Sequence, residues 1–340
     1  MRKQISSLRT PGFLLMHAAC LLVIWSGVSW VALYTCLALY LVRMIGITAG
    51  YHRYFSHRTY QTSRLFQFLL ALLGTSAAQQ GPLWWAAHHR YHHKFSDTQN
   101  DVHSPSIQGF WWAHVGWILA PENQNTKYDL VPDLIRFPEL RFLDKFYLLP
   151  PLVLAASLWV SGIVLASYLP ALETSGFQLL VWGFFVGTVL LYHSTFSVNS
   201  LTHIFGRRRF ETKDNSRNCW PVAIITMGEG WHNNHHYYPS SERHGFRWWE
   251  IDVSHYVLRL LCWMRIVWDL RSPPKLLVTS QPPDKPILQN LHGSIAANPK
   301  RVGGNPMIDY RARIGKMLDT SFTCESIYFG PTIQGLIRFR

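Results

Sequence analysis

Charged residues are scarce in this sequence, acidic ones above all. Asp, Glu, Lys and Arg make up 15% of the 340 residues, whereas hydrophobic residues make up 48%. An ordinary soluble domain carries about 25% charged residues, so we expect long apolar segments that avoid water. The 32 basic residues outnumber the 19 acidic ones, which gives a formal net charge of +13. Because there is no long basic block or nucleic-acid motif, this excess favours the cytoplasmic side of a membrane protein over nucleic-acid binding.

Cysteine is also rare, and redox motifs are absent from the sequence. The chain has five cysteines and no C-x-x-C pair. This pattern argues against a disulfide framework, a zinc site or an iron–sulfur cluster. The sequence has no cytochrome b5-like His-Pro-Gly-Gly segment, and no G-x-G-x-x-G follows a strand-like run. Electrons for any oxidation would therefore come from a separate protein.

Two parts of the chain are apolar enough to form helical hairpins. A helix needs about 20 residues to cross a bilayer. The run from Phe13 to Ile47 is longer, and Ser26–Ser29 offers a break within it. A cleaved signal peptide is the alternative, which the continuing apolar sequence disfavours. The link at 170–176 has no Lys or Arg and belongs on the far side of the membrane. We predict four spans at about 13–28, 29–50, 147–169 and 177–198.

Both hairpins return to the same face, so we predict an all-α membrane protein with a cytosolic helical cap. The cap comprises residues 51–146 and 199–275, which with the spans form one membrane domain over residues 1–275. A shorter apolar run, Phe66–Ala78, favours an interfacial or re-entrant helix. Residues 276–340 show little periodicity and predict a loosely ordered tail.

Most of the 17 histidines fall into tight groups beside the apolar segments. The groups are His52-Arg-Tyr-Phe-Ser-His57, His89-Arg-Tyr-His92-His93 and His232-Asn-Asn-His235-His236, with His203 near the end of the fourth span. Helix positions i, i+3 and i+4 share one face. We therefore expect each of the two His-x-x-His-His groups to converge on one point. His52 and His57 lie about 140° apart around a helix, so they bind different metals or the helix ends between them.

Eight or nine imidazoles are too many for one ion, so the pattern predicts two metals. Neutral imidazole binds iron, copper, nickel and zinc. Soluble di-iron proteins use two Glu-x-x-His motifs, and only one such spacing, Glu229 to His232, occurs here. An all-imidazole pair beside a membrane favours iron and the oxidation of a lipid C–H bond. A metal transporter or haem-binding membrane protein is an alternative, but it predicts ligands within the spans.

Longer segments around the histidines carry a recognisable pattern. They read GITAGYHRYFSHRTY at 46–60, WAAHHRYHHKFSD at 85–97, NSLTH at 199–203 and GEGWHNNHH at 228–236. Together they resemble the motifs of Δ9 acyl desaturases of the stearoyl-CoA desaturase type, in the same order, from about residue 12 to residue 270. The resemblance implies two iron ions that use O2 to place a cis double bond, Δ9, in a saturated fatty acyl chain. Hydroxylation of an acyl chain or alkane on the same site is the nearest alternative.

The resemblance also assigns roles to individual residues. It implies nine metal ligands: His52, His57, His89, His92, His93, His203, His232, His235 and His236. Asn199 would hold a metal-bound water, and Trp85 and Thr195 match positions that bend the acyl tunnel. Acyl-CoA members often carry Arg-Asp where Ala87-His88 stand here, so the carrier is open between CoA and a membrane phospholipid.

The resemblance further implies where the protein works and what supplies its electrons. The donor would be a separate cytochrome b5-, ferredoxin- or reductase-type protein. We expect an integral, multi-pass membrane location with the active site facing the cytoplasm. A bacterial inner membrane is favoured over the endoplasmic reticulum.

Helix geometry adds a prediction about the depth of the tunnel. Met44 and Tyr40 precede His52 by eight and twelve residues, which places them roughly 12 and 18 Å along the helix. We expect these two side chains to close the distal end, with ordinary helix packing as the alternative. Three carboxylates are candidate partners for ligand N–H groups, or else form salt bridges in the cap: Asp97, Asp101 and Glu229.

Overall fold

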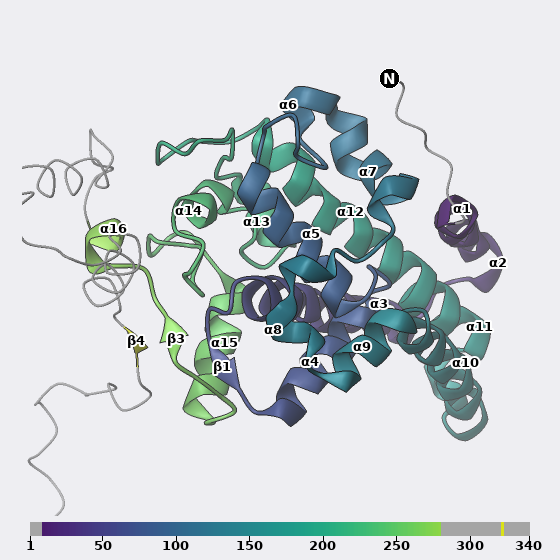
Figure 1. The fold of residues 1–340 in the computed structure, drawn as a ribbon. Helices are drawn as coiled ribbons and strands as arrows, with labels where there is room; N and C mark the ends of the chain where they lie inside the picture. The colour runs from purple at the N-terminus through teal and green to yellow at the C-terminus, as the bar shows by residue number, and fades with distance from the viewer. Residues whose placement is uncertain (1–8, 280–320, 323–340) are drawn as a thin grey trace, which may run out of the picture.

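The fold is described by a computed structural model, which covers residues 9–279 and 321–322. The described chain is mostly helical (Figure 1). Three of its helices are long and apolar enough to cross a membrane. They cover Trp30–Ser56, Leu149–Tyr168 and Gly176–His203. Three of the four predicted spans are thus present as helices of sufficient length.

The first predicted span forms a shorter apolar helix. It is built from α1 (Arg9–Ala19), η1 (Cys20–Leu22) and α2 (Val23–Ser26). Its apolar part, Thr10–Ser26, is shorter than the about 20 residues that a crossing needs. Gly27 then ends it with a φ of 62°, a conformation that glycine tolerates without strain. The four-span arrangement with a cytosolic cap stays a prediction.

Two of the long helices contain wider π-helical turns. The first joins α3 (Trp30–Ile45) to the π-helical η2 (Gly46–Ser56). The last joins α11 (Gly176–Leu179), the π-helical η7 (Leu180–Val186), α12 (Gly187–Ser200) and η8 (Leu201–His203). Between them, α10 (Leu149–Tyr168) is followed by η6 (Pro170–Leu172). A Cβ on Gly162 of α10 would lie 2.6 Å from the Cα of Gly176, so glycine allows α10 and α11 to touch.

The remaining elements are short and lie around the ends of these long helices (Figure 1). In chain order they are β1 (Gln61–Thr62), α4 (Arg64–Ser76), α5 (Pro82–Phe95), α6 (Pro105–Gln108), η3 (Trp112–Gly116), α7 (Trp117–Leu119), η4 (Pro121–Asn123), η5 (Tyr128–Leu130), α8 (Pro132–Ile135), α9 (Pro138–Lys145), α13 (Trp220–Ile225), α14 (His232–Tyr237), α15 (Val253–Trp263), β2 (Val267–Trp268), β3 (Leu270–Arg271), α16 (Lys275–Thr279) and β4 (Ser321–Phe322). The predicted interfacial helix at 66–78 corresponds to α4. Apart from α16 and β4, the predicted loose tail lies outside the described residues.

The largest hydrophobic core joins η2 to the helices around it. Fully buried side chains from η2, α5, α9 and α15 meet there, including Phe55, Leu83, Leu140 and Leu258. The Asp144 carboxylate accepts a hydrogen bond from the backbone N–H of Trp84 at 2.8 Å and so caps the start of α5. Two antiparallel strand pairs, β1 with β2 and β3 with β4, fasten the end of the described chain to the rest. This packing holds the histidine-bearing segments together.

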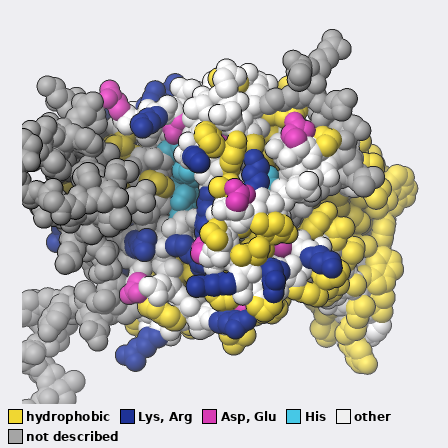
Figure 2. Space-filling model, in the orientation of Figure 1, with side chains coloured by type: hydrophobic (Ala, Val, Ile, Leu, Met, Phe, Trp, Pro, Cys, Tyr) yellow, Lys and Arg dark blue, Asp and Glu magenta, His cyan; other side chains and the backbone are white. Residues whose placement is uncertain are grey.

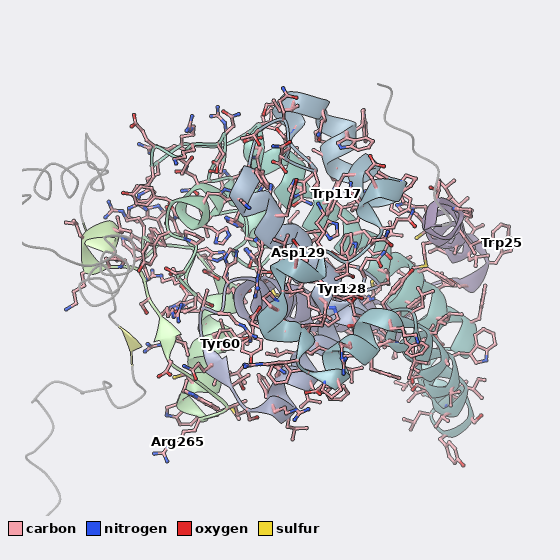
Figure 3. The ribbon with its side chains drawn as sticks, viewed as in Figure 1. Trp25, Tyr60, Trp117, Tyr128, Asp129 and Arg265 are labelled. Carbon is pink, nitrogen blue, oxygen red and sulfur yellow. The ribbon has the colours of Figure 1, made fainter. Side chains whose placement is uncertain are left out.

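The surface is divided between an apolar part and a basic part. Figure 2 shows hydrophobic side chains covering the side that carries α10 and α11, and Lys and Arg spread over the rest of the same face. Trp25 of α2 points outward on the apolar side and is 71% exposed (Figure 3). Trp117, in contrast, is buried and its ring lies 5.7 Å from that of Trp84. Exposed tryptophan on the apolar side is typical of a protein that contacts a bilayer.

Candidate metal centre

Nine histidines gather into two adjacent groups at the ends of the long helices. The first group has five members whose ligating nitrogens all lie within 4.8 Å of one another: His52, His57, His89, His93 and His235. The second group has four, under the same criterion: His92, His203, His232 and His236. These nine are the histidines that the sequence pattern singled out.

Within each group the Nε2 atoms face one another. They lie 2.8 Å apart between His57 and His89, and 3.0 Å apart between His52 and His235. In the second group the Nε2 atoms of His203 and His232 are 3.1 Å apart. Two nitrogens that bind one ion at about 2.1 Å, at right angles to each other, are separated by about 3.0 Å. The spacing therefore fits ligands of a shared metal ion.

Unpartnered nitrogens give a second test of the fit. Within the described part of the chain, the Nε2 atoms of His92 and His236 are buried and have no hydrogen-bond partner. A buried polar atom without a partner costs free energy unless something binds it. Both belong to the second group. A metal ion there would bind both atoms.

The two helical groups do not each converge on one point, contrary to the prediction from their spacing. The i and i+4 members of α5, His89 and His93, join the first group, while His92 joins the second. In α14 the i and i+4 members join the second group, and His235 joins the first. Residues three and four apart share a broad face but differ in direction. Each helix therefore supplies histidines to both groups.

His52 and His57 belong to the same group because the helix between them is not an α-helix. The last turn of η2 closes with a hydrogen bond from His57 N to His52 O at 3.2 Å, which spans five residues. In such a π-type turn, residues five apart lie roughly one turn apart. The sequence left open whether the two histidines bind different metals or the helix ends between them. In the structure η2 ends at Ser56, one residue before His57, and both histidines belong to the first group.

Four of the nine imidazoles use their other nitrogen to contact a carboxylate. His92 Nδ1 lies 3.0 Å from Asp101, His203 Nδ1 lies 2.8 Å from Asp97, and His236 Nδ1 lies 2.7 Å from Asp214. In the first group, His52 Nδ1 contacts Glu229. A carboxylate at Nδ1 holds the proton there and leaves Nε2 free as a ligand.

Asp214 was missed by sequence reasoning, whereas Asp97, Asp101 and Glu229 were candidates. It lies in an irregular loop 22 residues before His236, at no motif spacing. The loop is held by the Asp214 carboxylate, which also accepts a hydrogen bond from Ser216 N at 3.0 Å. Only the folded loop reveals the contact.

Burial keeps most of these imidazoles neutral. Burial lowers the pKa of His57, His89 and His93 well below the ordinary histidine value. The pKa of His236 falls to about 4, because burial outweighs the hydrogen bond to Asp214. For His92 burial acts in the same direction, but the nearby Asp101 carboxylate raises its pKa overall. Neutral imidazole is the form that binds a metal.

Two further histidines lie at the edge of the site. His244 groups with His52 and Glu229, and His103 groups with His92 and Asp101. Burial lowers the pKa of His103 to about 3. Neither residue belongs to the two main groups. His244 lies beside the first group and His103 lies beside the second.

An apolar cavity of about 810 Å³ opens beside the first group. Its walls come from α1, α5, α10, η7 and α12, and they include His89, Trp85, Thr195 and Asn199. The Trp85 ring stacks on His89 with centroids 5.1 Å apart. From Leu180 to Asn199 the lining follows one helix, a length of roughly 28 Å at 1.5 Å per residue. The cavity thus follows much of this helix and is lined in part by His89 of the first group.

Tyr40 and Met44 lie elsewhere, since neither is among the lining residues of this cavity. Met44 is buried in the core around η2. The Tyr40 hydroxyl lies 2.9 Å from Ser194 Oγ and donates to the carbonyl of Ile225. Their predicted role at the distal end of the tunnel stays a prediction.

Comparison with known proteins gives the class. The family model of fatty acid desaturases matches residues 28–264. The chain is 39% identical over 264 residues, 76% of its length, to an sn-1 stearoyl-lipid 9-desaturase from Anabaena variabilis, and covers 92% of it. It is 40% identical over 255 residues, 73% of its length, to an sn-2 palmitoyl-lipid 9-desaturase from Nostoc sp. (strain 36), and covers 84% of it. It is 36% identical over 265 residues, 77% of its length, to an acyl-CoA C20 Delta5-desaturase from Anemone leveillei, and covers 80% of it.

The chain belongs to the fatty acid desaturase family. It is an oxidoreductase that introduces a double bond into saturated fatty acyl chains. Its histidine groups are able to hold metal ions, and its long apolar helices suit a membrane location.

Proposed function

We propose that this enzyme desaturates an acyl chain at the Δ9 position while the chain is esterified to a membrane lipid. The observation that carries the proposal is the cavity lined by His89, α1, α10 and η7, because α10 and η7 belong to helices long and apolar enough to cross a membrane. Relatives from Anabaena, Synechocystis and Nostoc are named as lipid 9-desaturases. The named acyl-CoA relatives from Anemone make CoA the alternative carrier.

The two histidine groups would each hold one iron ion, with Asn199 binding the metal of the second group through water. Iron bound there supplies the oxygen-activating chemistry that removes hydrogens from two adjacent methylene groups, with electrons from a separate donor protein. The described residues contribute positioning. Trp85 stacks on His89 and forms the cavity wall, and Thr195 receives a hydrogen bond from Gln79 at 3.1 Å within the same lining. These contacts would hold the acyl chain of the substrate beside the two histidine groups.

The apolar lining serves the reaction in a second way. An unactivated methylene has no acidic proton, so no general base is required of the protein. Most of the cavity's lining is hydrophobic or aromatic, which excludes water from the reacting carbons. We propose that the metal end faces the cytoplasm, since His52 and His203 lie at the ends of two spanning helices on the basic side of the molecule.

The carrier is tested by supplying stearoyl-CoA and a stearoyl phospholipid separately to the purified, iron-loaded enzyme with a reducing system. We expect a product lacking two hydrogens with the phospholipid and little product with the CoA ester, read by mass spectrometry. If the enzyme converts the CoA ester and not the phospholipid, the proposal of a lipid carrier is contradicted. Addition of one oxygen atom instead would identify hydroxylation.

The ligand assignment is tested with His92→Ala. This substitution removes one of the four imidazoles of the second group, so we expect product to fall below detection while the protein remains inserted in the membrane. His255→Gln is the control, because His255 contacts Glu242 and lies outside both groups. Retained oxygen-dependent activity in His92→Ala would count against the di-iron site.

A further inference from the structure

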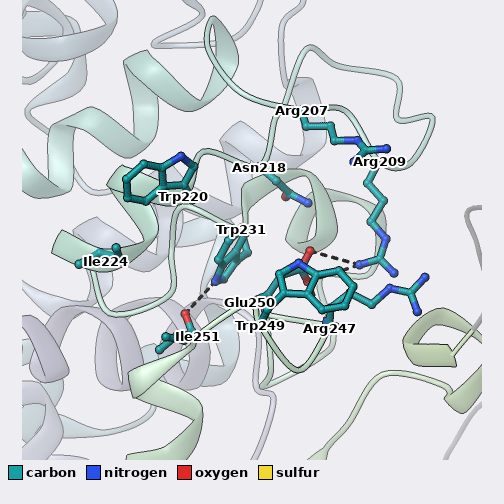
Figure 4. A pocket seen from close by; sticks show the side chains of 10 residues that line it. All are labelled: Arg207, Arg209, Asn218, Trp220, Ile224, Trp231, Arg247, Trp249, Glu250 and Ile251. Atoms are coloured by element: carbon teal, nitrogen blue, oxygen red, sulfur yellow. Dashed lines mark hydrogen bonds and ion pairs between the residues drawn. The ribbon is translucent and has the colours of Figure 1, made fainter.

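A second cavity, of about 790 Å³, is lined by residues between Arg207 and Ile251 (Figure 4). It shares no lining residue with the acyl cavity. Three segments form it: the loop at 207–209, helix α13, and the loop at 247–251. Asn218 and Trp231 complete the lining through backbone bridges, in which Asn218 pairs with both Arg207 and Trp231. Backbone pairing thus joins three of the lining residues, and the cavity needs an explanation separate from the acyl substrate.

The lining of this cavity is positively charged. Three arginines line it, Arg207, Arg209 and Arg247, together with one carboxylate, that of Glu250 (Figure 4). Glu250 already contacts Arg209 at 3.3 Å and accepts from Asn234 Nδ2 at 2.9 Å. Arg207 is exposed, and within the described residues no ion pair involves it. An arginine guanidinium has five donors and pairs well with phosphate, so the cavity suits an anionic ligand.

Most of the rest of the lining is apolar, and its helix α13 contacts the long helix that begins with α3. Trp220 is 64% exposed and Trp249 is 56% exposed, and Ile224 and Ile251 lie beside them in the lining (Figure 4). The Tyr40 hydroxyl of the first spanning helix donates to the carbonyl of Ile225 at 2.5 Å, which fixes α13 on that helix. Exposed tryptophan next to arginine is the composition of the bilayer's headgroup level.

We propose that this cavity binds the phosphate headgroup of a bilayer phospholipid that is not the substrate. The three arginines would contact the phosphate, while the indoles and isoleucines would contact the glycerol and the first acyl carbons. A phosphate-bearing lipid satisfies both halves of the lining, which neither a free anion nor a neutral lipid does. The site goes beyond the proposed desaturation, because the acyl cavity lies elsewhere.

The bound lipid would also brace the metal site. Asn218 Oδ1 accepts the backbone N–H groups of Asn233 and Asn234 at 3.0 and 3.2 Å, at the start of α14. Trp231, which directly precedes the ligand His232, donates from Nε1 to the carbonyl of Ile251 at 2.8 Å. The floor and rim of the cavity thus hold the first turn of the helix that carries three ligands.

The test measures lipid binding to the detergent-solubilised, full-length, iron-loaded protein by native mass spectrometry. The probes are phosphatidylglycerol, diacylglycerol with the same acyl chains, and inorganic phosphate. The variant is Arg207→Gln, whose side chain is exposed and outside the acyl cavity. Its matched control is Arg141→Gln, an exposed arginine on α9 that lines neither cavity. Binding is read without turnover, so the result does not depend on the carrier or on activity.

We expect phosphatidylglycerol affinity to fall roughly tenfold in Arg207→Gln, the loss of one charge-assisted contact, and to stay unchanged in Arg141→Gln. Diacylglycerol and inorganic phosphate should bind much more weakly than phosphatidylglycerol in the wild-type protein. Equal phosphatidylglycerol affinity in the two variants would overturn the proposal. So would equal binding of diacylglycerol or of inorganic phosphate. Unchanged lipid affinity with slower reduction by the electron donor would instead make the cavity a protein docking site.

Discussion

At the residue scale, the two metal groups differ in the carboxylates that hold their imidazoles. Three carboxylates contact histidines of the second group, namely Asp97, Asp101 and Asp214, whereas within the described residues Glu229 is the one carboxylate that contacts a histidine of the first. A carboxylate at Nδ1 fixes the tautomer and increases the basicity of the imidazole. The second site should therefore depend more strongly on residues that never touch the metal.

Asp214→Asn tests this dependence. The amide cannot hold the His236 Nδ1 proton as the carboxylate does, so we expect metal affinity or activity to fall about tenfold or more. The readouts are iron content per chain and the rate of product formation. Asp129→Asn, at an exposed position, is the control. Wild-type iron content and rate in Asp214→Asn would show that the contact is only structural.

At the scale of elements, the helices around the acyl cavity set its depth. Ala155 of α10 lines the cavity, and the neighbouring Ala156 is exposed on the same helix. Phe184 and Leu180 of η7 line the cavity as well. An aromatic ring introduced among them would occupy space that a long acyl chain needs.

We expect Ala155→Phe to shift the products toward shorter chains, while Ala156→Phe, whose added ring faces outward, leaves the chain-length profile unchanged. Fatty acid profiling by gas chromatography with mass spectrometry provides the measurement. The same profile from Met44→Ala tests the earlier expectation that Met44 closes the tunnel, in which case longer chains should be favoured. If Ala155→Phe matches the wild-type profile, the helices around the cavity do not set chain length.

At the scale of the whole molecule, the metal centre links segments that are far apart in the chain. The groups combine ligands from η2, α5, η8 and α14. The Nε2 atoms of His52 and His235, and those of His57 and His89, lie about 3 Å apart. Within the described residues, the buried Nε2 atoms of His92 and His236 have no hydrogen-bond partner. A bound metal ion would satisfy these nitrogens. A ligand that binds only the folded chain stabilises it, so the metals should contribute to global stability.

Removing iron with a chelator should lower the Tm. With free metal at 100 times its Kd, binding contributes about 2.7 kcal/mol, or roughly 4 °C for a chain of 340 residues. Differential scanning calorimetry gives the shift. Zinc, which has no redox chemistry, should restore the Tm without restoring activity, whereas iron should restore both. An unchanged Tm on chelation would mean that the histidine groups are stable empty.

The sequence by itself determined the family of the protein and indicated the nine histidines that the structure brings together. Apolar runs of membrane-spanning length and His-x-x-His-His spacings are local patterns, and helix geometry links them directly to local structure. The same reasoning named Asp97, Asp101 and Glu229, because they lie near the motifs in the chain.

Only the tertiary structure decided how the histidines are shared between the two sites. Spacing gives the face of one helix but not the angle between α5 and α14, which sends His92 and His235 to opposite groups. The loop that brings Asp214 to His236 and the arginine-lined cavity both depend on packing between distant segments. Such contacts join residues that no local spacing relates, and they form only when the chain folds.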